Sequence, residues 1–256
     1  MQAVEPDLHY FARKNRLSNI ERYFGDGGDP MVLNEQGQTA LHIAAKYIRT
    51  SIFKYLLIWG TDPFRLDLEG NSCLHIAIKS GAEAIVRIIV ALEGSSAFFE
   101  CPDSFGRVPV ELAIIEGQTK ILKIMIRSGA DPETDCSGVS PVILASTWNR
   151  DGIIKLLIQY HVDLSSVMED ASALRGAVSN QNPLSIMRLL RNGADPNVSF
   201  ADGRTVLHHA AEIGPACHVN MLIDFGAIVN TLDENGNLPI NYSANSKIRS
   251  LLAIHS

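Results

Sequence analysis

Apolar positions recur along the chain with the spacing of amphipathic helices. Four stretches each carry two adjacent apolar residues, two intervening positions and two more apolar residues, so all four side chains fall on one side of a helix. These sets are Ile52, Phe53, Leu56, Leu57; Ile85, Val86, Ile89, Val90; Ile121, Leu122, Met125, Ile126; and Ile153, Ile154, Leu157, Ile158. The pattern predicts helices whose apolar stripe must be covered by a neighbouring element.

A second motif precedes these stretches and sets a period. Thr39-Ala40-Leu41-His42-Ile43-Ala44 recurs as Ser-Cys-Leu-His-Ile-Ala at 72–77 and as Thr-Val-Leu-His-His-Ala at 205–210, with weaker copies between. The last alanines of successive copies are separated by 33, 36, 32, 32 and 33 residues; they are Ala44, Ala77, Ala113, Ala145, Ala177 and Ala210. A period near 33 indicates supersecondary units that bury their apolar faces only by stacking.

Turn residues separate the units at the same period. Most units close on an Asp-Pro pair or on a related motif such as Ala194-Asp195-Pro196-Asn197. A glycine precedes most copies of the opening motif, at Gly37, Gly70, Gly106, Gly138, Gly203 and Gly236. Proline and glycine at fixed offsets predict a projecting loop between one helix pair and the next.

These coincident motifs resemble the ankyrin-repeat family over essentially the whole chain. The resemblance implies an all-α fold, an α-solenoid of stacked helix-turn-helix repeats with short β-hairpin-like loops in a curved elongated array. We expect one domain over 1–256, with a degenerate first repeat and a truncated last one. The repeat boundaries are 1–33, 34–66, 67–102, 103–134, 135–166, 167–199, 200–232 and 233–256.

The longest interval in the period predicts a local insertion. Three extra residues enter between the second and third copies of the motif, within 92–103. This stretch contains Phe98 and Phe99, whose side chains we expect to pack onto the core of a lengthened loop.

Charge and composition narrow the classes of function. The formal net charge is −6 and no run of Lys or Arg stands out, which argues against nucleic acid and anionic membranes as partners. No apolar run approaches the roughly 20 residues that cross a bilayer, and the amino terminus lacks the pattern of a secretory signal. Four separated cysteines without a Cys-x-x-Cys pair fit reduced thiols in a cytoplasmic protein. We also expect the chain to be monomeric.

The repeated histidines invite a metal-site hypothesis that geometry disfavours. Packed helices stand about 8–10 Å apart, whereas zinc requires ligand nitrogens about 2 Å from one ion. The family resemblance instead implies a structural role in the repeat motif for His42, His75 and His208, together with Thr39 and Thr205. No phosphate-binding loop or nucleophile elbow is present, so we expect no metal, no cofactor and no enzyme activity.

The resemblance also implies that a partner protein binds a concave surface of loop tips and first helices. The repeat register places Lys46, Lys79 and the loop residue Leu68 on this surface. The main candidates are Tyr47, Glu69, Phe105, Ile115, Glu116, Trp148, Met168, Phe200, Asp202 and Ile213. Large apolar residues at exposed positions are typical binding anchors, although each aromatic ring could instead fold into its own repeat. The acidic residues favour a partner with basic residues.

The sequence therefore predicts a protein-protein interaction scaffold or adaptor. The alternative is the targeting part of a secreted bacterial effector or ubiquitin-ligase adaptor, which would act in the host cytosol; an enzyme is the least favoured interpretation. Asn197 resembles the asparagine that hydroxylases modify in other ankyrin proteins, and is a possible modification site. Its ordinary alternative is a loop asparagine that bonds its own turn.

Overall fold

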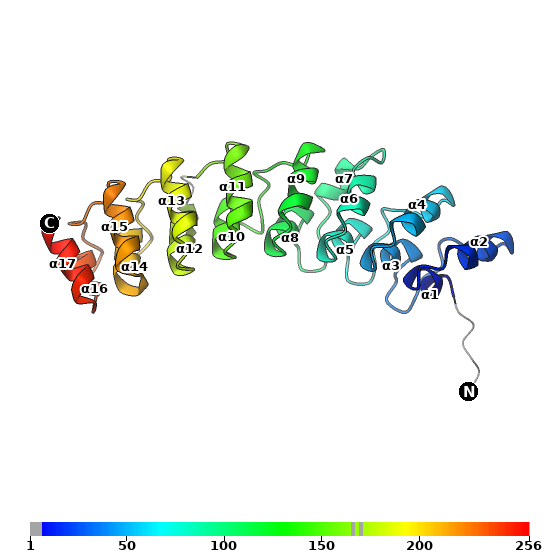
Figure 1. Cartoon of the computed structure of the whole chain (residues 1–256), viewed down its shortest axis with the longest axis horizontal. Coiled ribbons are helices and arrows are strands. Elements are labelled where there is room, and N and C mark those ends of the chain that lie inside the picture. Colours follow the sequence, from blue (N-terminus) through cyan, green and yellow to red (C-terminus); the bar gives the residue numbers. More distant parts are fainter. Residues whose placement is uncertain (1–6, 165–166, 169–170, 256) are drawn as a thin grey trace, which may run out of the picture. The chain divides into compact units, whose positions relative to one another are not determined.

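The chain folds into successive pairs of short helices, shown in Figure 1 as a computed structural model. The structure describes residues 7–164, 167–168 and 171–255. It divides into two compact units, residues 1–131 and 132–256, which are described separately below.

Unit 1 contains four helix pairs and one additional helical turn among its described residues. In chain order these are α1 (Leu8–Arg13), α2 (Leu17–Gly25), α3 (Ala40–Lys46), α4 (Thr50–Ile58), α5 (Cys73–Lys79), α6 (Glu83–Ile89), α7 (Ser96–Phe99), α8 (Pro109–Ile115) and α9 (Thr119–Arg127). The first helices α1, α3, α5 and α8 pack in one row, and the second helices α4, α6 and α9 pack in another. Helix α2 joins the second row through Phe24, which stacks on Trp59 at a centroid distance of 4.7 Å.

Unit 2 repeats this arrangement. Its helices are α10 (Pro141–Thr147), α11 (Asp151–Gln159), α12 (Ala173–Ser179), α13 (Pro183–Arg191), α14 (Val206–Ile213), α15 (Ala216–Asp224), α16 (Pro239–Tyr242) and α17 (Ser246–Ile254). First helices again pack on first helices and second helices on second helices. Between α11 and α12, the strands β1 (Val167–Met168) and β2 (Ala171–Ser172) pair antiparallel as a short hairpin. The predicted all-α repeat fold is confirmed.

The helices are stable because they stack. Most contain seven or nine residues, fewer than the roughly 12–15 that an isolated helix needs in water. In α6 the predicted apolar stripe is buried at Ile85, Val86 and Ile89, and the equivalent stripes of α4 and α9 are buried as well. Among the described residues, no helix combines the length and apolar composition that crossing a membrane requires.

The insertion after α6 forms the one-turn helix α7 and not an irregular loop. Phe98 and Phe99 are both buried, as predicted. The Phe98 ring stacks on Phe64 with a centroid distance of 4.4 Å and an interplanar angle of 13°. The three extra residues therefore add a local apolar cluster beside the α5–α6 repeat.

The loops preceding the first helices end in tight turns, which we call hairpin tips. In unit 1 they comprise residues 34–38, 67–71 and 103–107. Each tip contains a hydrogen bond in which a glycine N–H donates to the backbone carbonyl three residues earlier. Neighbouring tips are joined directly: the Leu68 N–H donates to the Gln36 carbonyl and the Ser104 N–H to the Glu69 carbonyl, both at 3.0 Å. The tips of unit 1 therefore form a continuous hydrogen-bonded row.

Gly70 and Gly106 allow the steric contribution of this row to be tested. Both have a positive φ, but a Cβ atom on Gly70 would lie 2.8 Å from the Ser104 nitrogen, whereas one on Gly106 would meet nothing within 4 Å. We expect Gly106→Ala to cost about 1–2 kcal/mol of unfolding free energy through backbone strain alone. Gly70→Ala should cost at least about 1 kcal/mol more, because it also forces the neighbouring tip away. Urea denaturation of the two variants measures the difference, and equal losses would contradict the direct packing of the tips.

Candidate functional site

A histidine motif fixes the start of the first helices. The Thr39 N–H donates to Nδ1 of His42 at 3.2 Å, and Nε2 of His42 lies 3.1 Å from the Asn71 carbonyl in the next hairpin tip. In unit 2, Thr205 and His208 make the same pair of contacts, at 3.0 Å within the motif and at 3.3 Å to the Asn237 carbonyl. Each histidine thus ties its own helix to the next repeat.

His9 and His75 occupy the equivalent position in their repeats. Nε2 of His9 lies 2.8 Å from the Gln38 carbonyl, so even the degenerate first repeat has this link. Nδ1 of His75 accepts from the Ser72 N–H at 3.2 Å, but its buried Nε2 has no hydrogen-bond partner among the described residues. The insertion changes the spacing: the corresponding carbonyl, that of Arg107, is 32 residues away, whereas the other links span 29 residues.

Burial keeps these imidazoles neutral. It lowers the pKa of His42, His75 and His208 below the ordinary value of a histidine, despite nearby carbonyls and carboxylates that raise it. The neutral ring with hydrogen on Nε2 can accept at Nδ1 and donate at Nε2, as the observed partners of His42 and His208 require. Within the described ranges, no three His, Cys, Asp or Glu side chains gather where they could hold a metal ion.

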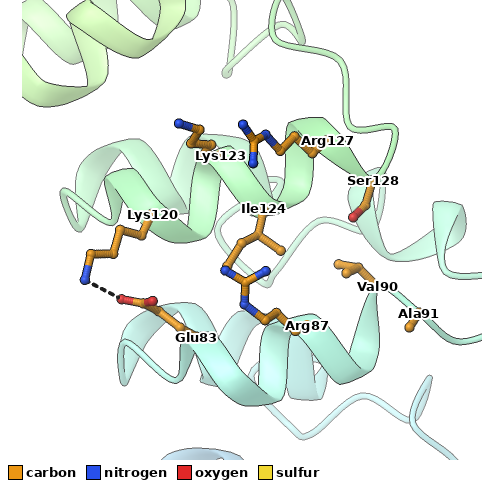
Figure 2. Close-up of a pocket in the computed structure, with 9 residues that line it drawn as sticks. All are labelled: Glu83, Arg87, Val90, Ala91, Lys120, Lys123, Ile124, Arg127 and Ser128. Carbon is orange, nitrogen blue, oxygen red and sulfur yellow. Dashed lines mark ion pairs between the residues drawn. The ribbon is translucent and has the colours of Figure 1, made fainter.

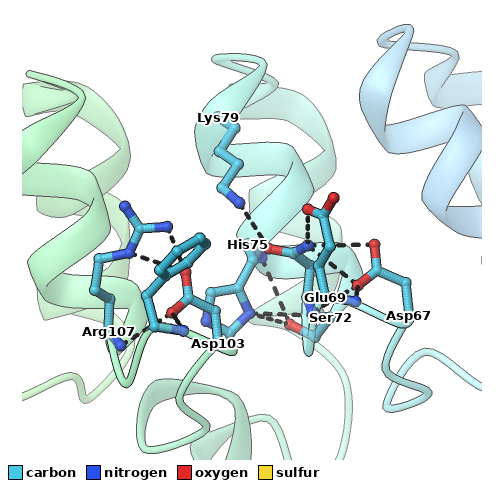
Figure 3. A network of polar contacts seen from close by, with 9 residues as sticks. Asp67, Glu69, Ser72, His75, Lys79, Asp103 and Arg107 are labelled. Atoms are coloured by element: carbon cyan, nitrogen blue, oxygen red, sulfur yellow. Dashed lines mark hydrogen bonds and ion pairs between the residues drawn. The ribbon is translucent and has the colours of Figure 1, made fainter. Parts of the chain in front are cut away.

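Carboxylates hold the hairpin tips in shape, as Figure 3 shows. Oδ1 of Asp67 accepts the Glu69 and Asn71 N–H groups at 3.0 and 2.8 Å, and the Asn71 side chain also bonds Asp67. Lys79 on α5 donates to Oδ1 of Asn71 at 2.7 Å. The lysine therefore connects the first helix to its own tip.

Asp103 has the same role in the following tip. Its Oδ1 accepts the Phe105 and Arg107 N–H groups, and its Oδ2 lies 2.7 Å from the Arg107 guanidinium. Burial tends to raise the pKa of Asp103, but the hydrogen bonds from Arg107 and Phe105 and the charge of Arg107 together outweigh burial and lower it. The carboxylate is thus held in its charged form, and the tip is rigid.

A groove of about 530 Å³ runs between the first two tips and helices α3 and α5. Residues of both charges line it together with the buried Ile76; the other lining residues include Glu35, Gln36, Lys46, Asp67, Leu68, Glu69 and Lys79. Leu68 stands at the edge of the groove with 77% of its surface exposed. We call the three tips together with α3, α5 and α8 the first-helix face of unit 1.

The predicted partner-binding residues of unit 1 lie on this face with different degrees of exposure. Phe105 is 73% exposed, and the Arg107 guanidinium lies 4.7 Å from its ring centroid. Tyr47 is half-buried and lines a smaller groove beside Arg13, whose guanidinium is 5.3 Å from the ring. Ile115 is half-buried, and Glu69 and Glu116 are exposed.

The predicted residues of unit 2 are more divided. Trp148 and Ile213 are 48% and 40% exposed, and Asp202 is exposed on its tip. The side chain of Met168 lies outside the described residues. The expectation that Phe200 is exposed is wrong, because only 6% of its surface is accessible.

Phe200 is buried because of its position in the equivalent hairpin tip of unit 2, residues 200–204. It stands three residues before Gly203, where Asp67 and Asp103 stand before their own glycines and point inward. The Arg175 guanidinium covers its ring at 4.6 Å. Aligning the repeats on the tip glycine, and not on the first helix, would have shown that Phe200 occupies the same inward-facing position as Asp67 and Asp103.

Asn197 links two repeats. Its Nδ2 donates to the Gly226 carbonyl at 3.0 Å, and its Oδ1 accepts the Ile228 N–H at 2.8 Å. Asp195 makes the turn-closing bond to the Asn197 N–H. The expectation that the Asn197 side chain bonds its own turn is therefore wrong; modification of this residue remains a prediction.

Stacked helix pairs, histidine links to the next repeat and projecting tips define a repeat protein of the ankyrin type. The family model for ankyrin repeats (3 copies) matches residues 8–97 and 174–255, more than half of the chain, and the chain belongs to the ankyrin-repeat family.

Relatives agree with this assignment. The chain is 27% identical to human inversin over 177 residues and 31% identical to neurogenic locus notch homolog protein 1 of Xenopus tropicalis over 168 residues. These matches cover 68% and 63% of the chain, but only 16% and 5% of the relatives, so the chain spans a small part of their length.

Solved structures show the same fold. The ankyrin repeat domain of Bcl-3 matches with a TM-score of 0.55 and 20% identity, covering 99% of this chain and all of that one. The human ASB11 ankyrin repeat domain matches with a TM-score of 0.54 and 18% identity over 97% of both chains.

Proposed function

We propose that this chain is a protein-binding scaffold or adaptor and that the first-helix face of unit 1 receives a segment of the partner. The observation that carries the proposal is the pair of large apolar side chains on neighbouring tips. Leu68 and Phe105 are 77% and 73% exposed, and the backbone bond between Glu69 and Ser104 joins their tips. Two water-exposed apolar anchors at such sites are typical of a binding surface.

The rigidity of the tips supports this role. Asp67 and Asp103 each fix their own tip by accepting several N–H groups, so the anchors are presented without a large loss of backbone freedom on binding. Full burial of a Leu or Phe side chain contributes about 1.5–3 kcal/mol. Two such anchors would supply a substantial part of the affinity of a specific complex.

The charges along the groove would position the partner. Among the described residues, the groove is lined by the acidic side chains of Glu35, Asp67 and Glu69 and by Lys46 and Lys79, so it carries both signs of charge with a small acidic excess. This small acidic excess supports the proposed preference for a partner with basic residues. A partner segment with basic residues beside apolar ones, and fewer acidic residues opposite the two lysines, complements this lining.

The proposal is tested by identifying a partner through affinity capture and then measuring its affinity for purified variants. Leu68→Ala and Phe105→Ala should each weaken binding by about tenfold or more, as expected for an anchor worth over 1.4 kcal/mol. Ile58→Ala is the matched control, because Ile58 is 82% exposed but lies on α4 in the second row. It should change the affinity by less than about twofold.

Unchanged affinity in both Leu68→Ala and Phe105→Ala would exclude this face as the binding surface. Trp148→Ala then tests the exposed tryptophan of unit 2. The identity of the captured protein distinguishes a general adaptor from the effector or ubiquitin-ligase alternative, since the latter requires a component of the ligase or of a host pathway.

A further inference from the structure

The second helices of unit 1 carry a groove that the partner-binding face does not use. It lies between α6 and α9, has a volume of about 480 Å³ and is shown in Figure 2. Arg87, Lys120, Lys123 and Arg127 line it, and Val90, Ala91 and Ile124 add apolar surface. The groove therefore combines an apolar lining with positive charge.

This positive charge is largely uncompensated. Of the described residues that line the groove, Glu83 alone is acidic, and its carboxylate pairs with Lys120 at 3.3 Å. Within the part of the chain that the structure describes, Arg87, Lys123 and Arg127 make no ion pair. Helix α9 itself contains no acidic residue. Three cations are thus available to an incoming ligand.

The groove differs in sign from the rest of the molecule. The chain has a net charge of −6, and among the described residues the groove on the first-helix face is lined by three acidic residues and two lysines. The sequence shows no basic run because these cations are three and four residues apart on α9 and are joined by Arg87 from the preceding repeat. Stacking of the repeats brings them together.

We propose that this groove binds an acidic, partly apolar segment of a partner protein. The positions from Lys120 to Arg127 span seven residues of helix, about 10 Å, so the cations form a row longer than a single phosphate. Val90 and Ala91, which are not buried, offer contacts to apolar side chains between the acidic ones. The surface thus complements a peptide in which carboxylates alternate with apolar residues.

Nucleic acid and lipid fit the groove less well. Binding to a phosphate backbone gains its affinity from many counterion-releasing contacts, and an acidic chain with a few clustered cations offers only a small number. A membrane surface is flat, whereas these cations surround a recess. The protein segment is therefore the ligand that charge, shape and apolar lining favour together.

The test uses fluorescence anisotropy with a labelled peptide of repeating Asp-Glu-Leu triplets and the full chain at low ionic strength. The wild type should bind the peptide, and added salt should weaken binding because the cations are exposed. The double variant Lys123→Glu/Arg127→Glu should weaken binding by about tenfold or more. A peptide with lysine in place of every acid should not bind.

Lys14→Glu/Lys54→Glu is the matched control. Both residues are exposed in unit 1, neither lines the groove, and the change in net charge is identical. This control should reduce affinity by less than about threefold, through long-range charge alone. Circular dichroism establishes that both double variants remain folded.

Equal loss of affinity in the two double variants would overturn the proposal, because binding would then follow net charge and not this groove. So would peptide binding unaffected by the groove variant, or tighter binding of single-stranded DNA or of anionic lipid vesicles than of the acidic peptide. Leu68→Ala, which tests the first-helix face, should leave this binding unchanged, so the two proposals fail independently.

Discussion

Phe98→Ala is expected to lower the free energy of unfolding by about 3–5 kcal/mol, the range for removing a buried phenyl ring. Phe98 is 2% exposed and stacks on Phe64, so the substitution removes both an apolar contact area and a ring stack. The surrounding repeat is held by the hydrogen-bonded tips and cannot collapse fully into the space. Urea denaturation followed by circular dichroism measures the loss.

Phe105→Ala provides the control for this prediction. It removes the same atoms seven positions away, but from a side chain that is 73% exposed. Its cost should be within about 0.5 kcal/mol, as for most surface substitutions. A loss of less than about 1 kcal/mol in Phe98→Ala would mean that α7 is a dispensable surface loop and not part of the core.

The repeat period and helix pairs could be predicted because they depend on short motifs within each repeat. The apolar residues Ile85, Val86 and Ile89 have the spacing of one face of a helix, and the Ser72–His75 motif marks the start of the preceding helix. Both signals are complete within a few residues. Tertiary stacking then reinforces what each segment already favours.

The exposure of individual tip residues could not be predicted in the same way. The slot three residues before the tip glycine faces inward and holds a capping carboxylate at Asp67 and Asp103, but an aromatic ring at Phe200. Burial of that ring depends on Arg175 from the preceding repeat. Sequence register alone places a residue on a tip without deciding which way its side chain points.

The basic groove was missed for a related reason. Arg87 and Lys123 are 36 residues apart in the sequence and approach only when α6 packs against α9. A search for consecutive cations cannot find such a cluster. Charges at one helical face must be compared across neighbouring repeats.

The histidine links predict a dependence of stability on pH. Burial lowers the pKa of His42, His75 and His208 in the folded chain, whereas these groups titrate near 6.5 when unfolded. Below pH about 6.5 the unfolded chain binds more protons than the folded chain, so these three groups make the free energy of unfolding fall as the pH is lowered. The fall continues until each lowered folded-state pKa is reached, and it has a slope of at most about 1.4 kcal/mol per pH unit for each histidine. Above pH about 7.5 these groups should have no effect.

His42→Asn isolates one of these contributions. Asn241 occupies the equivalent position of the last repeat, where its Oδ1 accepts the Leu238 N–H at 2.7 Å, so asparagine can keep the helix-capping contact. The variant loses the link from Nε2 to the Asn71 carbonyl, which should cost about 1 kcal/mol at pH 8. Between pH about 6.5 and 5 its stability should fall less steeply than that of the wild type, by up to about 1.4 kcal/mol per pH unit. Denaturation curves collected across this range give both slopes; parallel slopes would show that folding does not lower the pKa of His42.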